Sequence, residues 1–154
     1  MEEKFIDITS DILKNKKFQM LKLESHHGDN RYNHSLRVAL ETYNYTKNHS
    51  MDYKRATRAA LLHDFFLRKE LENPYGKGEL IEHPKVACQN AKKFFNIDEE
   101  TEEMMIDHMW PITHTKPKTN EGIVISLTDK KVSIKETLKY RMRKKGKVRW
   151  KIIM

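Results

Sequence analysis

The sequence predicts an all-α fold, and three observations lead to this prediction. Nearly every segment places its apolar residues at helical spacing, not in strand-like alternation. Five glycines and four prolines are too few to punctuate a series of β-hairpins. A chain of 154 residues, 38% of them hydrophobic, fits one core and leaves little room for a second. We therefore expect a single bundle of about six helices.

The first two helices are predicted on either side of a polar loop. The first runs from about Glu3 to Leu23 on the spacing of its apolar residues. Asp29 or Asn30 can cap the second, which runs from about Arg31 to Asn48. That helix has apolar residues on opposite sides, so we expect neighbours to cover both, with His34 facing inward.

The third and fourth helices are expected at the middle of the bundle. Asp52 can cap the third, whose central segment is apolar on all sides except for His63 and Asp64. These two residues are therefore expected deep in the protein. Pro84 is well placed at the first position of the fourth helix, whose core face begins at His83.

A fifth helix is expected to start at Asp98 or Thr101 and to carry His108. Pro111 ends it, because proline cannot continue a helix.

The net charge of +8 is concentrated at the end of the chain. A sixth helix, capped by Asn120, carries Asp129 on an apolar face. The segment Lys139 to Lys151 then holds eight basic residues and no acidic one. We expect a single helical domain over residues 1–138 and a basic tail over 139–154. The tail is expected to be a helix end followed by an extended or disordered segment, with a strand-like apolar finish.

Several classes of protein are excluded. The sequence has no apolar run long enough for a membrane span and no signal-peptide pattern at its start, so we expect a cytoplasmic protein without a membrane partner. Cys88 is the single cysteine, which excludes an internal disulfide and a zinc finger. A metal ion must therefore be held by histidines and carboxylates.

Six residues interrupt apolar stripes with side chains that can bind metal. They are His34, His63, Asp64, His83, His108 and Asp129. Burying such groups without partners costs several kcal/mol each, so one shared metal centre is an economical explanation for the set. Taken singly, each histidine is more typical of a hydrogen-bonded core or surface residue than of a metal ligand, and it is the set that favours a metal centre. The ligand types suit Fe, Mn, Co, Ni or Zn better than Mg alone.

The other histidines fall in loops or at helix ends, where we expect them at the surface. They are His26, His27, His49 and His114.

These motifs resemble a known family. His34 within Tyr-Asn-His-Ser, His63-Asp64 within Ala-Ala-Leu-Leu-His-Asp and Asp129 within Leu-Thr-Asp-Lys resemble the H…HD…D signature of the HD-domain metal-dependent phosphohydrolases. The resemblance runs from Asn30 to about Lys135. The segments His-Asp-Phe-Phe-Leu and His-Met-Trp-Pro further resemble a small uncharacterised group of bacterial HD proteins.

The resemblance implies a ligand set. His34, His63, Asp64 and Asp129 would hold one divalent ion. HD-GYP phosphodiesterases and HD-type dinucleoside polyphosphate hydrolases add two histidines in the middle and can hold a second ion. His83 and His108 fit that addition, with Asp64 bridging the ions; alternatively, one ion is bound and these histidines contact substrate phosphate.

The resemblance also implies hydrolysis of a phosphate ester or anhydride by a metal-bound hydroxide. The substrate would be a nucleotide or another small phosphorylated metabolite, with Asp64 and His63 at the reacting centre. Many relatives continue the pair as HDxxK, whereas here Arg68 follows four residues after Asp64. Arg68 and Lys130 are candidates for drawing in the phosphate.

The alternative hypothesis is a nucleic-acid-binding protein. The basic tail would then contact phosphates, and the HD core would be structural or degenerate.

Overall fold

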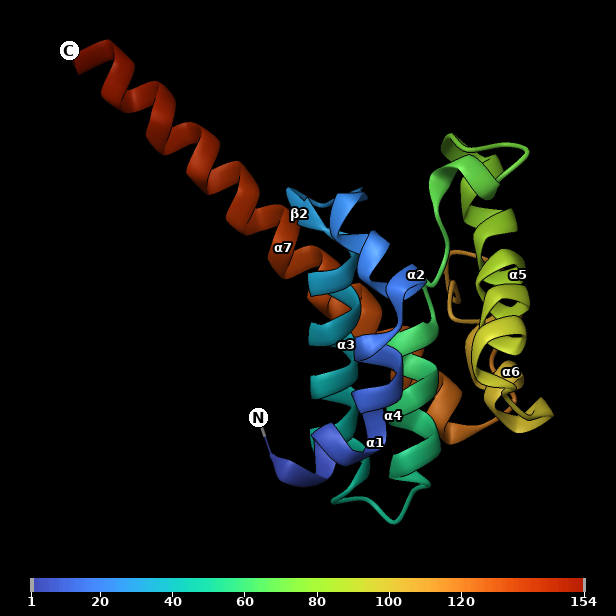
Figure 1. The fold of residues 1–154 in the computed structure, drawn as a ribbon. Coiled ribbons are helices and arrows are strands. Elements are labelled where there is room, and N and C mark those ends of the chain that lie inside the picture. Colours follow the sequence, from blue (N-terminus) through green and yellow to red (C-terminus); the bar gives the residue numbers. More distant parts are fainter. Residues whose placement is uncertain (1, 154) are drawn as a thin grey trace.

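Three helices form the centre of the protein in the computed structural model, which describes the backbone of residues 2–153 and the side chains of residues 2–146 (Figure 1). They are α3 (Arg31–Thr46), α4 (Tyr53–Leu62) and α7 (Asn120–Ile153). One side is covered by α1 (Glu3–Lys14), α2 (Lys16–Gln19) and the 3-10 helix η1 (Met20–Leu23). The other side is covered by α5 (Gly76–Phe95) and α6 (Glu99–Ile106), and a second 3-10 helix, η2 (Arg68–Glu70), precedes α5. The predicted all-α fold is confirmed.

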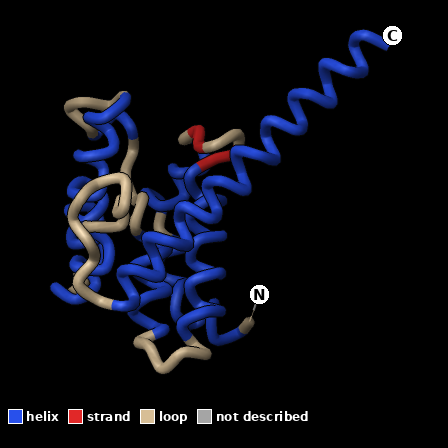
Figure 2. The backbone as a smooth tube through the Cα atoms, turned by 180° about the vertical axis from the view of Figure 1, so that it is seen from behind, coloured by secondary structure: helices blue, strands red, loops and turns tan. Residues whose placement is uncertain are grey.

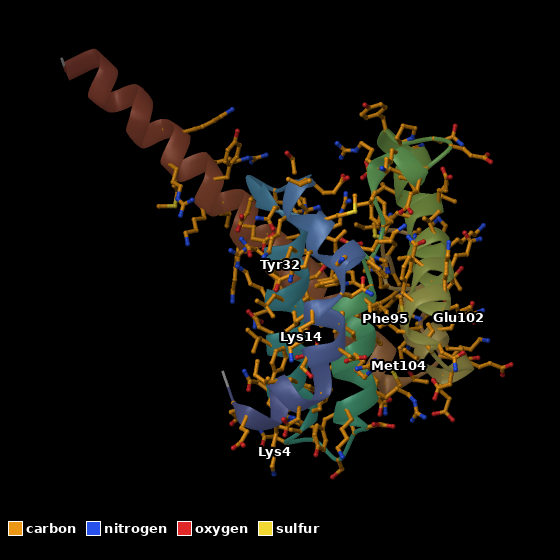
Figure 3. All side chains as sticks on the ribbon, in the orientation of Figure 1. Lys4, Lys14, Tyr32, Phe95, Glu102 and Met104 are labelled. Atoms are coloured by element: carbon orange, nitrogen blue, oxygen red, sulfur yellow. The ribbon has the colours of Figure 1, made fainter. Side chains whose placement is uncertain are left out.

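Side chains fill the space between these helices (Figure 3). The apolar core is continuous from Phe5 of α1 through Val38 and Leu61 to Met104 of α6 and Ile125 of α7. A continuous core explains how helices distant in sequence hold a common site between them.

Three predicted caps are present. The side chains of Asn30, Asp52 and Asp98 accept hydrogen bonds from backbone N–H groups in the first turns of α3, α4 and α6. At α7, the hydroxyl of Thr119 accepts from the backbone N–H of Gly122, so the cap lies one residue before the expected Asn120.

The predicted helix over residues 3–23 is broken at Asn15. Its side chain accepts from the backbone N–H of Phe18 and starts α2, and Phe18 is then fully buried against Phe65. The apolar periodicity continues across the break, so helical spacing alone gives no sign of it.

Three further predictions about helix ends were wrong. Helix α6 ends at Ile106, so His108 lies in the turn beyond it and Pro111 is not what ends it. Helix α4 ends at Leu62, so His63 and Asp64 lie just beyond its C-terminus and not at mid-helix. Pro84 lies inside α5, which begins earlier, at Gly76. The early turns of α5 are held by Glu82, whose carboxylate accepts from the backbone N–H groups of Glu72 and Asn73.

The polar loop before α3 is a small β-hairpin. Strands β1 (Ser25–His26) and β2 (Asp29–Asn30) pair in antiparallel fashion. The turn residues His27 and Gly28 both have positive φ, 45° and 82°, as the favoured two-residue hairpin turn requires. Figure 2 shows the hairpin beside α7, where Gly28 lies against the ring of Tyr140.

The last helix extends further than expected. Helix α7 continues to Ile153 and projects from the bundle, so the expected strand-like finish is helical (Figure 1). Among the described residues, no helix is both long and apolar enough to cross a membrane.

Candidate metal centre

The six residues predicted as metal ligands lie together in the middle of the bundle. They come from five parts of the chain: His34 from α3, His63 and Asp64 from the turn after α4, His83 from α5, His108 from the turn after α6, and Asp129 from α7. All six side chains are buried.

Four of them form a first group around one oxygen of Asp64. His34 Nε2 lies 2.9 Å from Asp129 Oδ1 and 4.0 Å from Asp64 Oδ2. His63 Nε2 lies 3.5 Å from each of the same two oxygens. Two imidazole nitrogens and two carboxylate oxygens therefore face a common point.

The other two histidines form a second group around the other oxygen of Asp64. His83 Nε2 lies 3.2 Å and His108 Nε2 lies 3.5 Å from Asp64 Oδ1. The two Nε2 atoms are 3.0 Å apart. Asp64 thus presents one oxygen to each group.

Backbone carbonyls determine which ring nitrogen carries the proton in three of these histidines. The Nδ1 atoms of His63, His83 and His108 lie 2.7, 2.7 and 2.8 Å from the carbonyls of Ala60, Glu79 and Met105. A carbonyl only accepts, so each Nδ1 is the donor and a neutral ring has its lone pair on Nε2. In the neutral rings of His83 and His108, both Nε2 atoms are acceptors, so neither can donate a hydrogen bond to the other across the 3.0 Å between them. A cation bound by both nitrogens would satisfy this pair.

His34 is oriented by a carboxylate. Its Nδ1 lies 2.9 Å from Glu136 Oε2, and Glu136 Oε1 accepts from Arg37 at 2.7 Å. Histidine ligands of metals commonly donate their second N–H in this way. Glu136 is not among the residues predicted for the site, although it follows Asp129 by seven residues, two helical turns along the same face of α7.

The electrostatics of the centre favour positive charge. Burial alone would raise the pKa of Asp64 and Asp129, but the neighbouring histidines hold both pKa values well below the usual range. Burial opposes protonation of His34, yet Asp129 and Glu136 raise its pKa to about 9. His108, where burial dominates, has its pKa lowered to about 4. Carboxylates that attract a proton to His34 would also attract a metal ion.

The residues present fit a divalent metal ion. Within the described part of the chain, His63 Nε2 and Asp64 Oδ1 are buried without a hydrogen-bond partner. Such atoms are costly unless something binds them. The ligand atoms of His34, His63 and Asp129 lie within 4.8 Å of one another, as do those of His63, Asp64 and His108. These distances suit donors arranged around an ion.

A cavity of about 720 Å³ opens over the centre. Asp64, His83, His108 and Asp129 line its floor, and four cationic side chains lie on its walls: Arg31, Arg68, Lys130 and Arg141.

Lys130 and Arg68, the two residues predicted to draw in phosphate, both reach this cavity. Lys130 Nζ lies 3.1 Å from Asp129 Oδ2 and donates to the carbonyl of His108, and Arg68 Nη2 lies 3.5 Å from Glu79 Oε1.

Two residues that line the cavity were not predicted from the sequence as site residues. Arg31 is buried, donates to the carbonyl of Phe66 at 2.9 Å and stacks over the Phe66 ring at 3.8 Å. His26 was expected at the surface, but its ring packs on His34 with centroids 4.2 Å apart. Burial, reinforced by His34, lowers the pKa of His26 to about 2. No local pattern marks either residue, because their neighbours come from distant segments.

The other three histidines expected at the surface are exposed: His27, His49 and His114. Cys88 is buried in the core and does not line the cavity.

Comparison with known proteins identifies the family. No curated protein and no solved structure matches the sequence. A family model described as the HD domain matches residues 31–132, well over half of the chain and a segment that includes all six residues of the two groups. Members of this family are mostly metal-dependent hydrolases that act on phosphate compounds. The chain therefore belongs to the HD domain family.

Proposed function

We propose that the protein is a metal-dependent phosphohydrolase that cleaves a phosphate ester or anhydride of a small phosphorylated metabolite, a nucleotide being the leading candidate. The observation that carries the proposal is the position of Asp64. Its two oxygens face two separate groups of imidazole nitrogens at the floor of a cationic cavity.

The chain would hold two divalent ions. His34, His63, Asp129 and Asp64 Oδ2 would hold one, and His83, His108 and Asp64 Oδ1 the other. Bound divalent ions acidify water and polarise a phosphoryl oxygen, which are the two requirements of phosphate hydrolysis at neutral pH. The donor set of imidazoles and carboxylates suits Fe, Mn, Co, Ni or Zn.

The residues on the cavity walls would bind and orient the phosphate. Arg31 is held rigidly by Phe66 and by Glu24, 3.3 Å from its guanidinium, and it therefore presents a fixed positive charge. Lys130 is anchored between Asp129 and the backbone of His108, next to both groups of ligands. Arg68 is half-buried at the cavity wall. Arginine and lysine in such positions neutralise charge on a transferring phosphoryl group.

The shape of the cavity supports a small substrate. Its volume of about 720 Å³ lies in the range typical of metabolite pockets. The cavity is also lined by apolar side chains from three parts of the chain, namely Leu80, Ile112, Ile134 and Leu138. A substrate that combines a phosphate with a less polar group would match this mixed lining.

A covalent cysteine intermediate is not part of the proposal. Burial raises the pKa of Cys88 to about 12, and the thiol lies in the core away from the cavity. Its nucleophilic thiolate is therefore scarcely populated at neutral pH.

Metal content and hydrolysis, measured on the same preparations, test the proposal. Asp64→Asn keeps the volume of the bridging side chain but removes its charge, and we expect it to lose both bound metal and turnover of nucleoside phosphates. His108→Gln should reduce metal content from about two ions to about one. His114→Gln, at an exposed histidine, is the control and should match the wild type. Full metal content and activity in Asp64→Asn would reject the proposal.

A second candidate function rests on the far part of α7. Beyond the bundle this helix carries exposed Arg143, Lys144 and Lys145, and a basic helix that projects from the body can lie along a nucleic-acid backbone (Figure 1). Replacing all three residues with Gln tests this function and leaves Tyr140, which contacts the hairpin, in place. Salt-sensitive RNA or DNA binding that is lost in this variant, with hydrolysis retained, would support it.

A further inference from the structure

His26 lies at the metal centre although it belongs to a separate element, the β1–β2 hairpin. In the hairpin, Gly28 lies against the ring of Tyr140 of α7, and at the exposed surface the hydroxyl of Thr137 lies 3.3 Å from His27 Nδ1. Arg37 of α3 also donates to Asp29 at 2.5 Å. The hairpin is thus fixed over the centre, with His26 on its inner side and His27 exposed.

The His26 ring has an unpaired nitrogen on its buried side. Within the described residues, Nε2 is buried without a hydrogen-bond partner. One ring nitrogen of His26, one of His34 and one carboxylate oxygen of Asp64 all lie within 4.8 Å of one another. The ring also lines the cavity. A histidine that has a buried, unpartnered ring nitrogen and lies beside two candidate ligands has the surroundings of a ligand itself.

We propose that His26 is a further metal ligand, binding through Nε2 to the ion that His34 and Asp64 hold. This inference rests on the proposed function, because it requires metal at the centre. It assigns the hairpin a role as well: binding through His26 would tie β1 to the centre and strengthen that wall of the cavity when metal is bound.

Titration of metal-free protein with Co²⁺ against a competing chelator tests the assignment, since the visible spectrum of bound Co²⁺ reports its ligands. His26→Gln removes the imidazole and keeps a side chain of similar length. His27→Asn is the matched control, because the neighbouring side chain is exposed and asparagine tolerates its left-handed backbone. We expect His26→Gln to bind Co²⁺ at least about tenfold more weakly at one site, with an altered spectrum, and His27→Asn to resemble the wild type.

A second variant gives a positive signal. In His26→Cys a thiolate takes the ligand position, and we expect a sulfur-to-cobalt charge-transfer band that His27→Cys lacks. Hydrogen exchange supplies an independent readout: Co²⁺ should slow exchange of the hairpin amides in the wild type and not in His26→Gln.

The outcomes separate this inference from the proposed function. If the wild type binds no Co²⁺, the proposed function fails. If the wild type binds Co²⁺ while His26→Gln keeps its affinity and spectrum and His26→Cys shows no thiolate band, the assignment of His26 is wrong and the proposed function stands. If His26→Gln raises the KM for substrate but leaves the Co²⁺ affinity unchanged, His26 is not a ligand and is a substrate contact.

Discussion

Replacing Glu136 with Gln should weaken metal binding without removing any ligand. Glu136 is buried and accepts from His34 Nδ1 at 2.9 Å and from Arg37 Nη1 at 2.7 Å. Glutamine keeps the size of the side chain and one acceptor but loses the negative charge that makes the imidazole more basic. Changes of this kind at the partner of a ligating histidine typically lower affinity by 10- to 100-fold, or about 1.4–2.7 kcal/mol.

Affinity is a better readout of this change than thermal stability. The charge-assisted hydrogen bonds at Glu136 contribute up to about 3 kcal/mol to the metal-free fold, so melting alone would mix two effects. We would measure Co²⁺ affinity by chelator competition, together with urea unfolding of the metal-free variant. The expected result is a loss of affinity at one site, with the second site, formed by His83 and His108, much less affected.

Glu41→Gln is the matched control. Glu41 also bridges α3 and α7, but it pairs with surface Lys131 and Lys135 at 2.7 and 3.3 Å, away from the metal centre. Such exposed pairs contribute about 0–1 kcal/mol. Equal affinity in Glu136→Gln and the wild type, or an equal loss in both variants, would refute the role given to Glu136.

Three other predictions concern the fold. Burial raises the pKa of Cys88 to about 12, so the thiol of the native protein should resist thiol reagents at pH 8. In denaturant it should react stoichiometrically. Rapid labelling of the native protein would contradict the buried position of Cys88. Phe18→Ala should destabilise the protein by about 3–5 kcal/mol in urea unfolding, because its ring is fully buried, whereas Leu23→Ala, at a residue 85% exposed, should change stability by less than about 0.5 kcal/mol. Gly28→Ala should lower the free energy of unfolding by at least about 1 kcal/mol, since φ is 82° and a Cβ would meet the Tyr140 ring. Adding Tyr140→Ala should recover part of this stability. An unchanged stability in Gly28→Ala would show that the hairpin is not packed on α7.

Local features of the fold could be predicted because their interactions span few residues. The caps at Asn30, Asp52 and Asp98 each accept from a backbone N–H three residues ahead, so residue type and position are enough to find them. The inward direction of His34 followed from the periodicity of its helix. The helix break at Asn15 was missed because the apolar spacing continues through it.

The ends of α4 and α5 depended on more distant contacts. His63 donates to the carbonyl of Ala60, one of the carbonyls that lack a helical partner at the end of α4. The turn that begins at His63 directs Asp64 toward His83 of α5 and His108 after α6. The early start of α5 depends on Glu82 holding the preceding loop. Helical spacing alone describes neither interaction.

The sequence by itself determined the all-α fold, the HD pattern and the six candidate ligand residues, because these depend on residue type and order. Only the tertiary structure decided how they meet. The division of Asp64 between two groups of histidines, the contact between His83 and His108, and the presence of His26 and Glu136 at the centre all require helices far apart in sequence to pack together. Packing of that kind is set by the shape of the whole core, and no short segment of the chain encodes it.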